Sequence, residues 1–484
     1  MIESPLLKQV EGYIGGGWTG GNGETFAVLN PATGEALAQA PVMGAAETEQ
    51  AIAAAKSALR LASPYSIAER RQWLEGVRDA LLAEKQEIGR ILCLEHGKPL
   101  KEAVGEVDYA AGFFDYCAKY IDHLEPHAVP EKAKNCDWTV HYRPIGVVGL
   151  ITPWNFPIGM IAKKLSAALA AGCPSVIKPA EDTPLTMIAA FRAIHDRNVL
   201  PEGMINLVMG PPKPIGDTLC QSRDVPMLSF TGSTGVGQHL IRQTADQVKK
   251  LSLELGGNAP FIVFDDADVD DAINQLIGNK FRGGGQTCVC TNRLYVQAGI
   301  AETFASKLAE RVSALKVGDG MEEGTEIGPL INQAGFDKVR RHVQDALAKG
   351  GRLLAGTHPD ELPEKGSLFY PPTLVSGVAP DSACCDEETF GPFIPLIHFD
   401  TEEEVLEKAN DTDYGLASYL FTGDSDRATR MIAALRFGHV GWNTGTGPTP
   451  EAPFGGMKAS GIGREGGIEG LFEFVEPQTV PRGA

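Results

Sequence analysis

VVGLITPWNFPIGMIAKKLSAALAAGCPSVIK, residues 147–178, is the stretch that decides the fold class. Residues 147–152 form a short apolar run that leads into a proline-containing turn, and residues 160–171 continue with a helical pattern. A second apolar run follows at residues 175–178. A buried strand, a helix and another buried strand in this order are typical of a parallel sheet that helices cover.

The same alternation extends along most of the chain. Apolar runs closed by glycine recur at residues 205–208 and 227–230, and a second such region begins near residues 260–264 and runs to about residue 450. A chain of 484 residues is also too long for a single hydrophobic core. We therefore predict an α/β protein with two parallel-sheet domains.

Segments outside this alternation have other patterns. Residues 45–120 carry apolar side chains at helical intervals, with Thr48 as a candidate N-cap. Residues 138–142 alternate like a strand of a hairpin, and residues 471–480 alternate like an edge strand. We expect this last segment to pair with another segment or another subunit.

Composition and charge exclude several classes of protein. Lysine and arginine number 43 against 62 aspartates and glutamates, a formal charge of −19, which argues against nucleic acid or an anionic membrane as the main partner. The chain shows no apolar run of about 18 residues and no secretory signal. Its nine cysteines are irregularly spaced and lack a zinc-site pattern, so we expect a reduced, cytoplasmic enzyme without a metal.

One of these cysteines, Cys288, lies where a reactive thiol would be placed. Three glycines, at positions 283–285, lead into it, so the main chain can approach a ligand closely. A thiol on such a loop can be reached and deprotonated, whereas a core cysteine behaves as an inert small hydrophobe. This segment alone leaves both interpretations open.

Three further segments carry polar groups that suit a ligand site. Glu254 lies in an apolar run, where a carboxylate either has a raised pKa and acts as a general base or is paired structurally. Lys178 and Glu181 follow a strand and suit ribose hydroxyls, although Glu181 would equally favour a helix dipole. Residues 231–237, rich in glycine and hydroxyls, suit either an anion at a helix N-terminus or a tight turn.

These segments belong to a set of seven short motifs. They occur in this order: Pro153-Trp-Asn-Phe-Pro157, Lys178-Pro-Ala-Glu181, Phe230-Thr-Gly-Ser233, Glu254-Leu-Gly-Gly257, Gly285-Gln-Thr-Cys288, Glu388-Thr-Phe-Gly-Pro392 and Pro453-Phe-Gly-Gly-Met-Lys458. Together they resemble the aldehyde dehydrogenase superfamily over nearly the whole chain. Residues 285–293, 178–184 and 460–466 look most like the succinate-semialdehyde dehydrogenases of that family.

The resemblance implies a reaction and a residue for each of its steps. Cys288, as the thiolate, attacks the aldehyde carbonyl, and the Asn155 side-chain amide and the Cys288 backbone N–H stabilise the oxyanion of the thiohemiacetal. A nicotinamide takes the hydride, and Glu254 activates water to release the acid from the thioester. Relatives that transfer the acyl group to coenzyme A usually lack this glutamate, so the resemblance implies hydrolysis.

The resemblance also implies a cofactor site for NAD, with NADP as the alternative. The expected cofactor-binding residues are Trp154, Lys178, Pro179, Ala180, Glu181, Gly232, Ser233, Leu255, Glu388 and Phe390. Lys178 and Glu181 match the adenosine end, Ser233 the pyrophosphate, Glu388 the nicotinamide ribose, and Phe390 lies near the ring. We expect NAD because a carboxylate at Glu181 would repel a 2′-phosphate and accept hydrogen bonds from a ribose diol.

Three residues are expected to hold the far end of an acidic semialdehyde. Arg282 matches one carboxylate-binding arginine of the succinate-semialdehyde enzymes. Lys163 replaces their second arginine and keeps its charge but loses the planar fork, and only Thr449 supplies a hydroxyl where they have a serine. These departures leave the substrate open between succinate semialdehyde, glutarate semialdehyde and another acidic or aromatic aldehyde.

The family's architecture implies three parts. An NAD-binding domain of residues 1–121 and 144–255 is followed by a catalytic domain of residues 256–455. Residues 122–143 and 456–484 form an oligomerisation element and a C-terminal strand, which we expect to build a homodimer or homotetramer.

Two alternatives complete the sequence analysis. Cys290 either forms a reversible disulfide with Cys288 under oxidation or simply packs in the core. The chain as a whole is either an enzyme or an inactive structural protein on the same fold. The presence of Cys288, Asn155 and Glu254 argues against the inactive protein.

Overall fold

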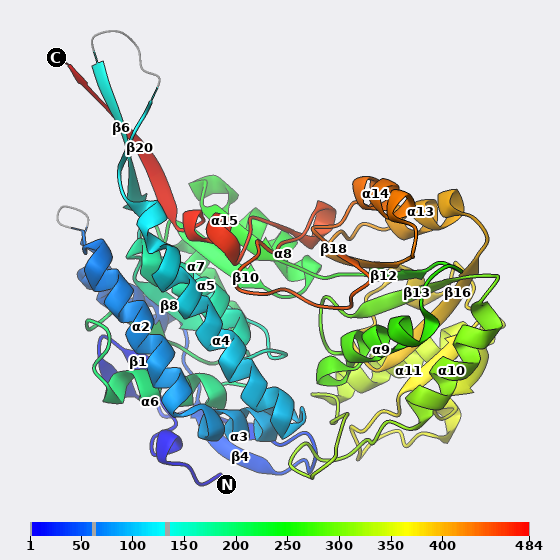
Figure 1. The fold of residues 1–484 in the computed structure, drawn as a ribbon. Coiled ribbons are helices and arrows are strands. Elements are labelled where there is room, and N and C mark those ends of the chain that lie inside the picture. The colour runs from blue at the N-terminus through cyan, green and yellow to red at the C-terminus, as the bar shows by residue number, and fades with distance from the viewer. Residues whose placement is uncertain (1, 61–63, 131–135, 484) are drawn as a thin grey trace.

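Two α/β domains and a projecting β arm make up the molecule (Figure 1). The computed structural model describes residues 2–60, 64–130 and 136–483 of the chain. Parts of the predicted helical region and of the predicted oligomerisation element, residues 61–63 and 131–135, lie outside the described residues.

The first sheet lies at the centre of the N-terminal domain, and five of its strands, β7, β8, β9, β10 and β11, run parallel to one another. Its strands follow in the order β19 (Gly461–Ile462), β11 (Lys250–Glu254), β10 (Met227–Thr231), β7 (Val148–Ile151), β8 (Ser175–Lys178), β9 (Ile205–Leu207), β1 (Gly12–Ile14) and β2 (Gly17–Thr19). Parallel strands end at the same edge of a sheet, which is where open α/β sheets bind ligands. The segments that follow β7, β8, β10 and β11 therefore all reach one edge.

The stretch that decides the fold class forms the elements that its pattern predicts. β7 and β8 are almost wholly buried, and every residue of the intervening helix α5 (Gly159–Ala171) is buried. α5 ends at Gly172, where φ is 81°, a left-handed conformation that glycine adopts without a clash of a Cβ. Burial on both faces of the sheet explains why these runs are apolar throughout and do not alternate.

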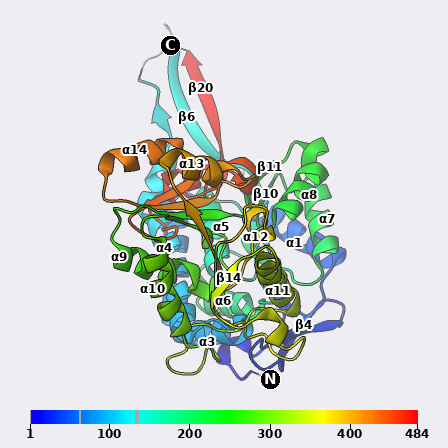
Figure 2. The same ribbon diagram turned by 90° about the vertical axis from the view of Figure 1, so that its right-hand side faces the viewer.

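Helices cover both faces of the first sheet (Figure 2). One layer consists of α5 and α6 (Leu185–Asp196), with three further helices packed outside them: α2 (Ile67–Ala83), α3 (Lys85–His96) and α4 (Leu100–Tyr120). The opposite layer consists of α1 (Ala45–Ala58), α7 (Pro212–Gln221) and α8 (Thr234–Thr244). A hairpin of β3 (Thr25–Leu29) and β4 (Ala36–Pro41) completes this domain. The predicted helical region 45–120 is thus confirmed as α1 to α4.

The second domain has a mostly parallel sheet of its own. Its strands follow in the order β14 (Arg352–Ala355), β15 (Thr373–Ser376), β16 (Phe393–Phe399), β13 (Thr291–Gln297), β12 (Ala259–Val263), β17 (Ala417–Phe421) and β18 (His439–Trp442). Its helices are α9 (Val269–Lys280), α10 (Ala301–Ser313), α11 (Gln333–Ala348), α12 (Ala383–Asp386), α13 (Glu402–Asn410) and α14 (Ser425–Ala434). Alternate residues of β12 pack into two separate cores, since Phe261 joins one and Ile262 the other. The predicted fold class, two parallel-sheet α/β domains with a small β element, is confirmed.

A third sheet forms the arm that projects from the first domain (Figure 1). β20 (Val475–Gly483) pairs antiparallel with β6 (Cys136–Pro144) along its whole length, and β5 (His127–Ala128) pairs with the other edge of β6. The C-terminal strand predicted from alternation therefore exists and finds its partner within the chain. β20 is an edge strand, and every residue after Val475 in it is exposed.

Two local predictions are wrong. Residues 471–472 belong to a short helix, α15 (Gly467–Phe472), because Leu471 turns into the core there. Thr48 is not the N-cap of α1, which begins after Gly44. Its hydroxyl lies inside the helix and donates to the Gly44 carbonyl oxygen at 2.7 Å.

No helix in the described part of the chain is long and apolar enough to cross a lipid bilayer. All strands of the first sheet except the short β19 precede residue 255, and all strands of the second sheet follow residue 258. The exact domain boundaries stay predictions.

Candidate active site

Segments from both domains meet at the carboxyl edge of the first sheet. Asn155 follows β7, and Glu254 is the last residue of β11. Cys288 lies between α9 and β13, and Glu388 lies just before β16. The registers of β10 with β7 and with β11 bring the ends of these strands level, so residues far apart in the sequence surround one site.

Cys288 lies between two cavities. The larger cavity, of about 350 Å³, is lined among others by Trp154, Asn155, Gly232, Ser233, Leu255, Gln286, Lys338, Glu388 and Phe390. The smaller cavity, of about 20 Å³, is lined among others by Tyr109, Phe156, Lys163, Glu254, Arg282, Pro448, Phe454 and Glu465. Cys288, Met160 and Thr231 line both. The thiol thus stands where a ligand in either cavity can reach it.

The surroundings of Cys288 mostly disfavour its thiolate. Burial raises the pKa of Cys288 to about 12, and the carboxyl groups of Glu388 and Glu254 act in the same direction. Lys163 opposes them and lowers this pKa. Burial also works against the charge of Lys163 itself, but Tyr109 and neighbouring acidic groups raise the pKa of Lys163 overall, so it is a cation.

Glu254 is a buried carboxyl group with neither oxygen hydrogen-bonded in the described part of the chain. Burial, together with the nearby Glu465, raises the pKa of Glu254 well above its ordinary value. Lys163, Lys164 and Arg464 lower the pKa and limit the shift. A buried carboxyl group with free oxygens and a raised pKa has the properties of a general base.

The Asn155 amide contacts the loop that carries Cys288. Its Nδ2 donates to the Gln286 carbonyl oxygen at 2.9 Å, and its Oδ1 has no partner among the described residues. The main chain is packed tightly here. A Cβ on Gly257 would lie 2.4 Å from the Cys288 carbonyl oxygen, and one on Gly285 would lie 2.3 Å from the Gly391 carbonyl oxygen. Of the three glycines before the thiol, Gly285 therefore serves a close approach to other main chain of the protein, and the predicted approach to a ligand stays a prediction.

The larger cavity has polar groups that could hold an anion and a ribose. Ser233 is the N-cap of α8, and its Oγ accepts the Val236 N–H at 3.4 Å, so a helix N-terminus suited to an anion lies at the cavity wall. Glu388 accepts the Gly257 N–H at 3.2 Å, and burial raises the pKa of Glu388 to about 7.

Two aromatic rings meet at the wall of the same cavity. Trp154 and Phe390 lie edge to face with ring centroids 5.5 Å apart. Phe390 has a φ of 60°, a left-handed conformation that costs energy in a non-glycine residue and is typical of functional sites. Trp154 and Phe390 both line the larger cavity, and their contact with a cofactor stays a prediction.

The residues predicted for the adenosine end lie apart from the larger cavity. The Lys178 Nζ lies 3.3 Å from the Glu181 Oε2, so these two side chains are paired as their spacing suggests. Glu181 lines a separate cavity of about 460 Å³. Asn332 lines both this cavity and the one beside Cys288. Pro179 and Ala180, between Lys178 and Glu181, line neither.

The predicted substrate residues are only partly brought together. Lys163 and Arg282 both line the small cavity, with the Lys163 Nζ 4.7 Å from the Phe454 ring centroid and the Arg282 guanidinium 4.7 Å from that of Phe156. Thr449 is half-buried and does not line this cavity, whereas the preceding Pro448 does.

Tyr109 and Glu465 are among the small-cavity residues that sequence reasoning did not single out. Tyr109 belongs to α4, where helical periodicity does not separate it from core aromatics. Glu465 accepts a hydrogen bond from Lys164 and lies 3.9 Å from the Lys163 Nζ. Glu465 lies in the glycine-rich segment 460–466, and the part of this segment in the family resemblance could have pointed to it.

Comparisons with known proteins agree with this fold. The family model for the aldehyde dehydrogenase family matches residues 18–480. A rice mitochondrial succinate-semialdehyde dehydrogenase is 46% identical over 100% of this chain and 91% of its own length. A glutarate-semialdehyde dehydrogenase of Pseudomonas putida is 44% identical over 98% of each chain. The crystal structure of an oxidoreductase from Marinobacter aquaeolei superposes with a TM-score of 0.98 and 66% identity over the whole of both chains.

Fold and site together define an α/β oxidoreductase with a thiol beside a nucleotide-sized cavity. The chain belongs to the aldehyde dehydrogenase family. Enzymes of this family use NAD or NADP.

The electrostatics of Cys288 predict how fast its thiol is alkylated. Since its pKa is about 12, the rate with iodoacetamide in the absence of cofactor is expected to rise about tenfold per pH unit between about pH 7 and about pH 9. Lys163→Met should slow the reaction several-fold at each pH, because it removes the cation that lowers the pKa of Cys288. Lys213→Met, on the exposed face of α7, is the control. An unchanged rate in the Lys163 variant would contradict this account of the thiol.

Proposed function

We propose that the chain oxidises a short aldehyde with an anionic far end, such as succinate semialdehyde, to the carboxylic acid, with NAD as the preferred cofactor. The observation that supports this most is the small cavity itself, which holds a thiol, Cys288, a buried carboxyl group, Glu254, and the cations Lys163 and Arg282. The rice and Pseudomonas putida relatives are named for succinate and glutarate semialdehyde.

Cys288 is the proposed nucleophile. Its thiolate attacks the carbonyl carbon of the aldehyde, and Lys163 offsets part of the cost of a negative sulfur at a buried site. Negative charge then develops on the carbonyl oxygen. The proposed donors to that oxygen are the Cys288 backbone N–H and the Asn155 Nδ2, which keeps one proton besides the one that it donates to Gln286.

Glu254 is the proposed base for the second half of the reaction. It takes a proton from water as the water attacks the acyl carbon of the thioester, and the Cys288 sulfur leaves as the thiolate. The reaction needs the ionised carboxylate, and its raised pKa makes that ion a stronger base than an exposed glutamate. Lys163, Lys164 and Arg464 lower this pKa and so favour the ionised carboxylate.

The larger cavity is the proposed cofactor site. The first turn of α8 with Ser233 would hold the pyrophosphate and Glu388 the nicotinamide ribose, while the adenosine ribose would extend beyond this cavity to Lys178 and Glu181. When bound there, NAD or NADP supplies the hydride acceptor. The chain's contribution is to orient that group against Cys288 and to exclude water.

The far end of the substrate is proposed to lie against Lys163 and Arg282. A carboxylate between two cations forms charge-assisted hydrogen bonds, and the Arg282 guanidinium can form two of them at once. Thr449 stays a predicted third anchor. The substrate stays open between succinate semialdehyde, glutarate semialdehyde and another acidic or aromatic aldehyde.

The β arm is proposed as the oligomerisation element of a homodimer or homotetramer. β20 presents an exposed edge that pairs with no other strand among the described residues, and such edges in natural proteins are normally covered or paired. A second copy of the chain would cover it. We also propose a cytoplasmic location, since all nine cysteines are free thiols in the described part of the chain.

A substrate panel tests the proposed reaction. Succinate and glutarate semialdehyde should be oxidised with a much higher kcat/KM than an uncharged aldehyde of the same length. Arg282→Met should lower kcat/KM for the acidic substrates about 30-fold, equivalent to about 2 kcal/mol for one charge-assisted hydrogen bond, and leave the uncharged aldehyde unaffected. Lys101→Met, an exposed cation on α4, is the matched control. Equal rates for charged and uncharged aldehydes in the unmodified protein would contradict the proposal.

The cofactor preference rests on Glu181. Glu181→Ser should raise kcat/KM with NADP and lower it with NAD, each by roughly tenfold, because the carboxylate is then absent from the 2′ position. Asp182→Asn changes the neighbouring carboxylate and should leave the ratio unchanged. The measurement is initial-rate kinetics with both cofactors. A preference that does not move in the Glu181 variant would remove this residue from the cofactor site.

Deleting residues 476–484 tests the role of the arm. Light scattering after size-exclusion chromatography should show a smaller assembly for the truncated protein than for the full chain. Removing only residues 483–484 is the control, and thermal unfolding of both proteins checks that the domains stay folded. The same particle mass in the truncated protein would show that subunits associate elsewhere.

A further inference from the structure

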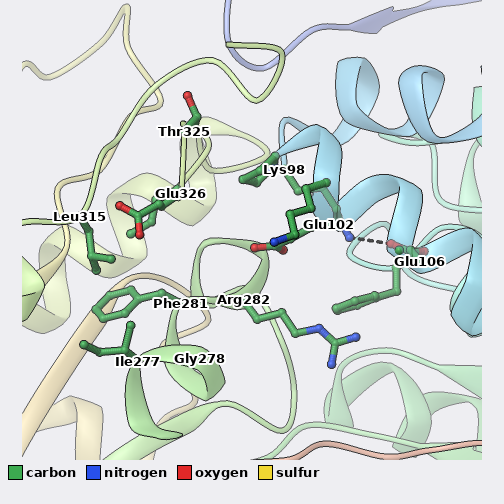
Figure 3. Close-up of a pocket in the computed structure, with 15 residues that line it drawn as sticks. Lys98, Glu102, Glu106, Ile277, Gly278, Phe281, Arg282, Leu315, Thr325 and Glu326 are labelled. Atoms are coloured by element: carbon green, nitrogen blue, oxygen red, sulfur yellow. Dashed lines mark hydrogen bonds and ion pairs between the residues drawn. The ribbon is translucent and has the colours of Figure 1, made fainter. Parts of the chain in front are cut away.

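Three charged residues at the beginning of α4 lie close to the site without lining the cavities beside Cys288. Lys98 lies two residues before the helix, and Glu102 and Glu106 lie in its first two turns, one helical repeat apart and therefore on one face. They border a cavity of about 520 Å³ between the two domains, across which they face Phe281 and Arg282 (Figure 3).

Lys98 and Glu106 hold the segment that carries Asn155. The Lys98 Nζ donates to the Glu106 Oε2 and to the Asn155 main-chain oxygen, both at 2.7 Å. The other carboxylate oxygen, Oε1, accepts the N–H groups of Ile158 and Gly159 at 3.1 and 3.0 Å. These N–H groups at the beginning of α5 have no partner within their own helix. Lys98 thus holds the turn that includes Asn155 at its carbonyl oxygen, and Glu106 holds the residues that follow at their N–H groups.

The burial of this ion pair indicates what it contributes. The side chains of Lys98 and Glu106 are each 1% exposed. Replacing a buried ion pair by apolar groups of similar size is often neutral or stabilising, so such a pair is weak evidence for a role in stability. Its hydrogen bonds instead fix the positions of the main-chain groups that they contact, which are the Asn155 oxygen and the N–H groups of Ile158 and Gly159.

Glu102 reaches from the first domain to the loop that carries Cys288. Its Oε2 accepts the Gly283 N–H at 2.8 Å. Gly283, Gly284 and Gly285 all have left-handed φ values, of 58°, 69° and 77°. Glycines have many alternative conformations of similar energy, so this loop needs contacts from outside to hold one of them. Glu102 supplies such a contact three residues before the Gln286 carbonyl oxygen, which accepts the hydrogen bond from Asn155.

From these contacts we infer that Lys98, Glu102 and Glu106 are positioning residues, which fix the Asn155 turn and the Gly283–Gly285 loop so that the oxyanion donors are aligned on Cys288 before substrate binds. The inference rests on the proposed roles of Cys288 and Asn155. An error of about 1 Å in such an alignment is enough to cost about 100-fold in rate.

Two variants and one rescue test the inference in the full-length protein. Glu102→Ala removes the acceptor for the Gly283 N–H, and Glu102→Gln keeps an oxygen that can accept it. The burst rate of NADH formation in a single turnover should fall about 10- to 100-fold in Glu102→Ala and recover to within about threefold of the unmodified protein in Glu102→Gln. KM for NAD should stay unchanged in both, because neither substitution touches the larger cavity. Lys101→Ala, an exposed neighbour on α4, is the matched control.

A readout without substrate or cofactor separates alignment from loss of folded protein. Hydrogen exchange of the amides in residues 281–290 should be faster in Glu102→Ala and normal in Glu102→Gln, while the strands of both sheets exchange as in the unmodified protein. A purely structural role would instead lower the amount of folded enzyme and leave the burst rate per active thiol unchanged.

The double variant Lys98→Met/Glu106→Leu keeps the test decisive if Glu102→Ala does not fold. It replaces the buried pair with apolar side chains of similar length, so it should fold and still show a burst rate lowered at least tenfold. Normal burst rates in the variants, with an active unmodified protein, would overturn the inference alone. An unmodified protein that oxidises no aldehyde of the panel would instead overturn the proposed function.

Discussion

The contact between the main chain of Gly257 and the carbonyl oxygen of Cys288 is the constraint on which the rest of the site depends. No side chain fits there, because a Cβ would lie 2.4 Å from that oxygen. Gly285 meets the main chain at Gly391 just as closely. Contacts between main-chain atoms cannot relax as flexible side chains do. They fix the thiol at the junction of the two domains, with one cavity on each side of it.

Burial sets the chemical character of the groups around this junction. It raises the pKa of Cys288, Glu254 and Glu388, and therefore favours their neutral forms, although the proposed reaction uses Cys288 and Glu254 as ions. Lys163 works against this effect at both Cys288 and Glu254. A nucleophile and a base that are strong when ionised follow from this balance.

The sequence was most informative where a residue type is required by geometry or by chemistry. Cys288, Asn155 and Glu254 stand in short local motifs, and the structure places all three around one pair of cavities. Prediction was weaker where contacts are made between distant segments. Nothing in the helical pattern of α4 distinguishes Tyr109, which faces the small cavity, from a core aromatic. Thr449 was chosen for its hydroxyl, but Pro448 lines the cavity, since the path of that loop depends on its packing.

The sequence by itself determined the strand–helix alternation, the fold class and the segments that carry the thiol, the amide and the carboxylate. The physical reason is that apolar periodicity and glycine requirements are local properties of the chain. Only the tertiary structure decided which charged and polar groups become hydrogen-bond partners. Glu102 and Gly283, or Lys98 and the Asn155 carbonyl oxygen, become partners only because two sheets and α4 pack around one edge. The pKa shifts at Cys288 and Glu254 depend likewise on burial and on charges from several elements, which no single segment encodes.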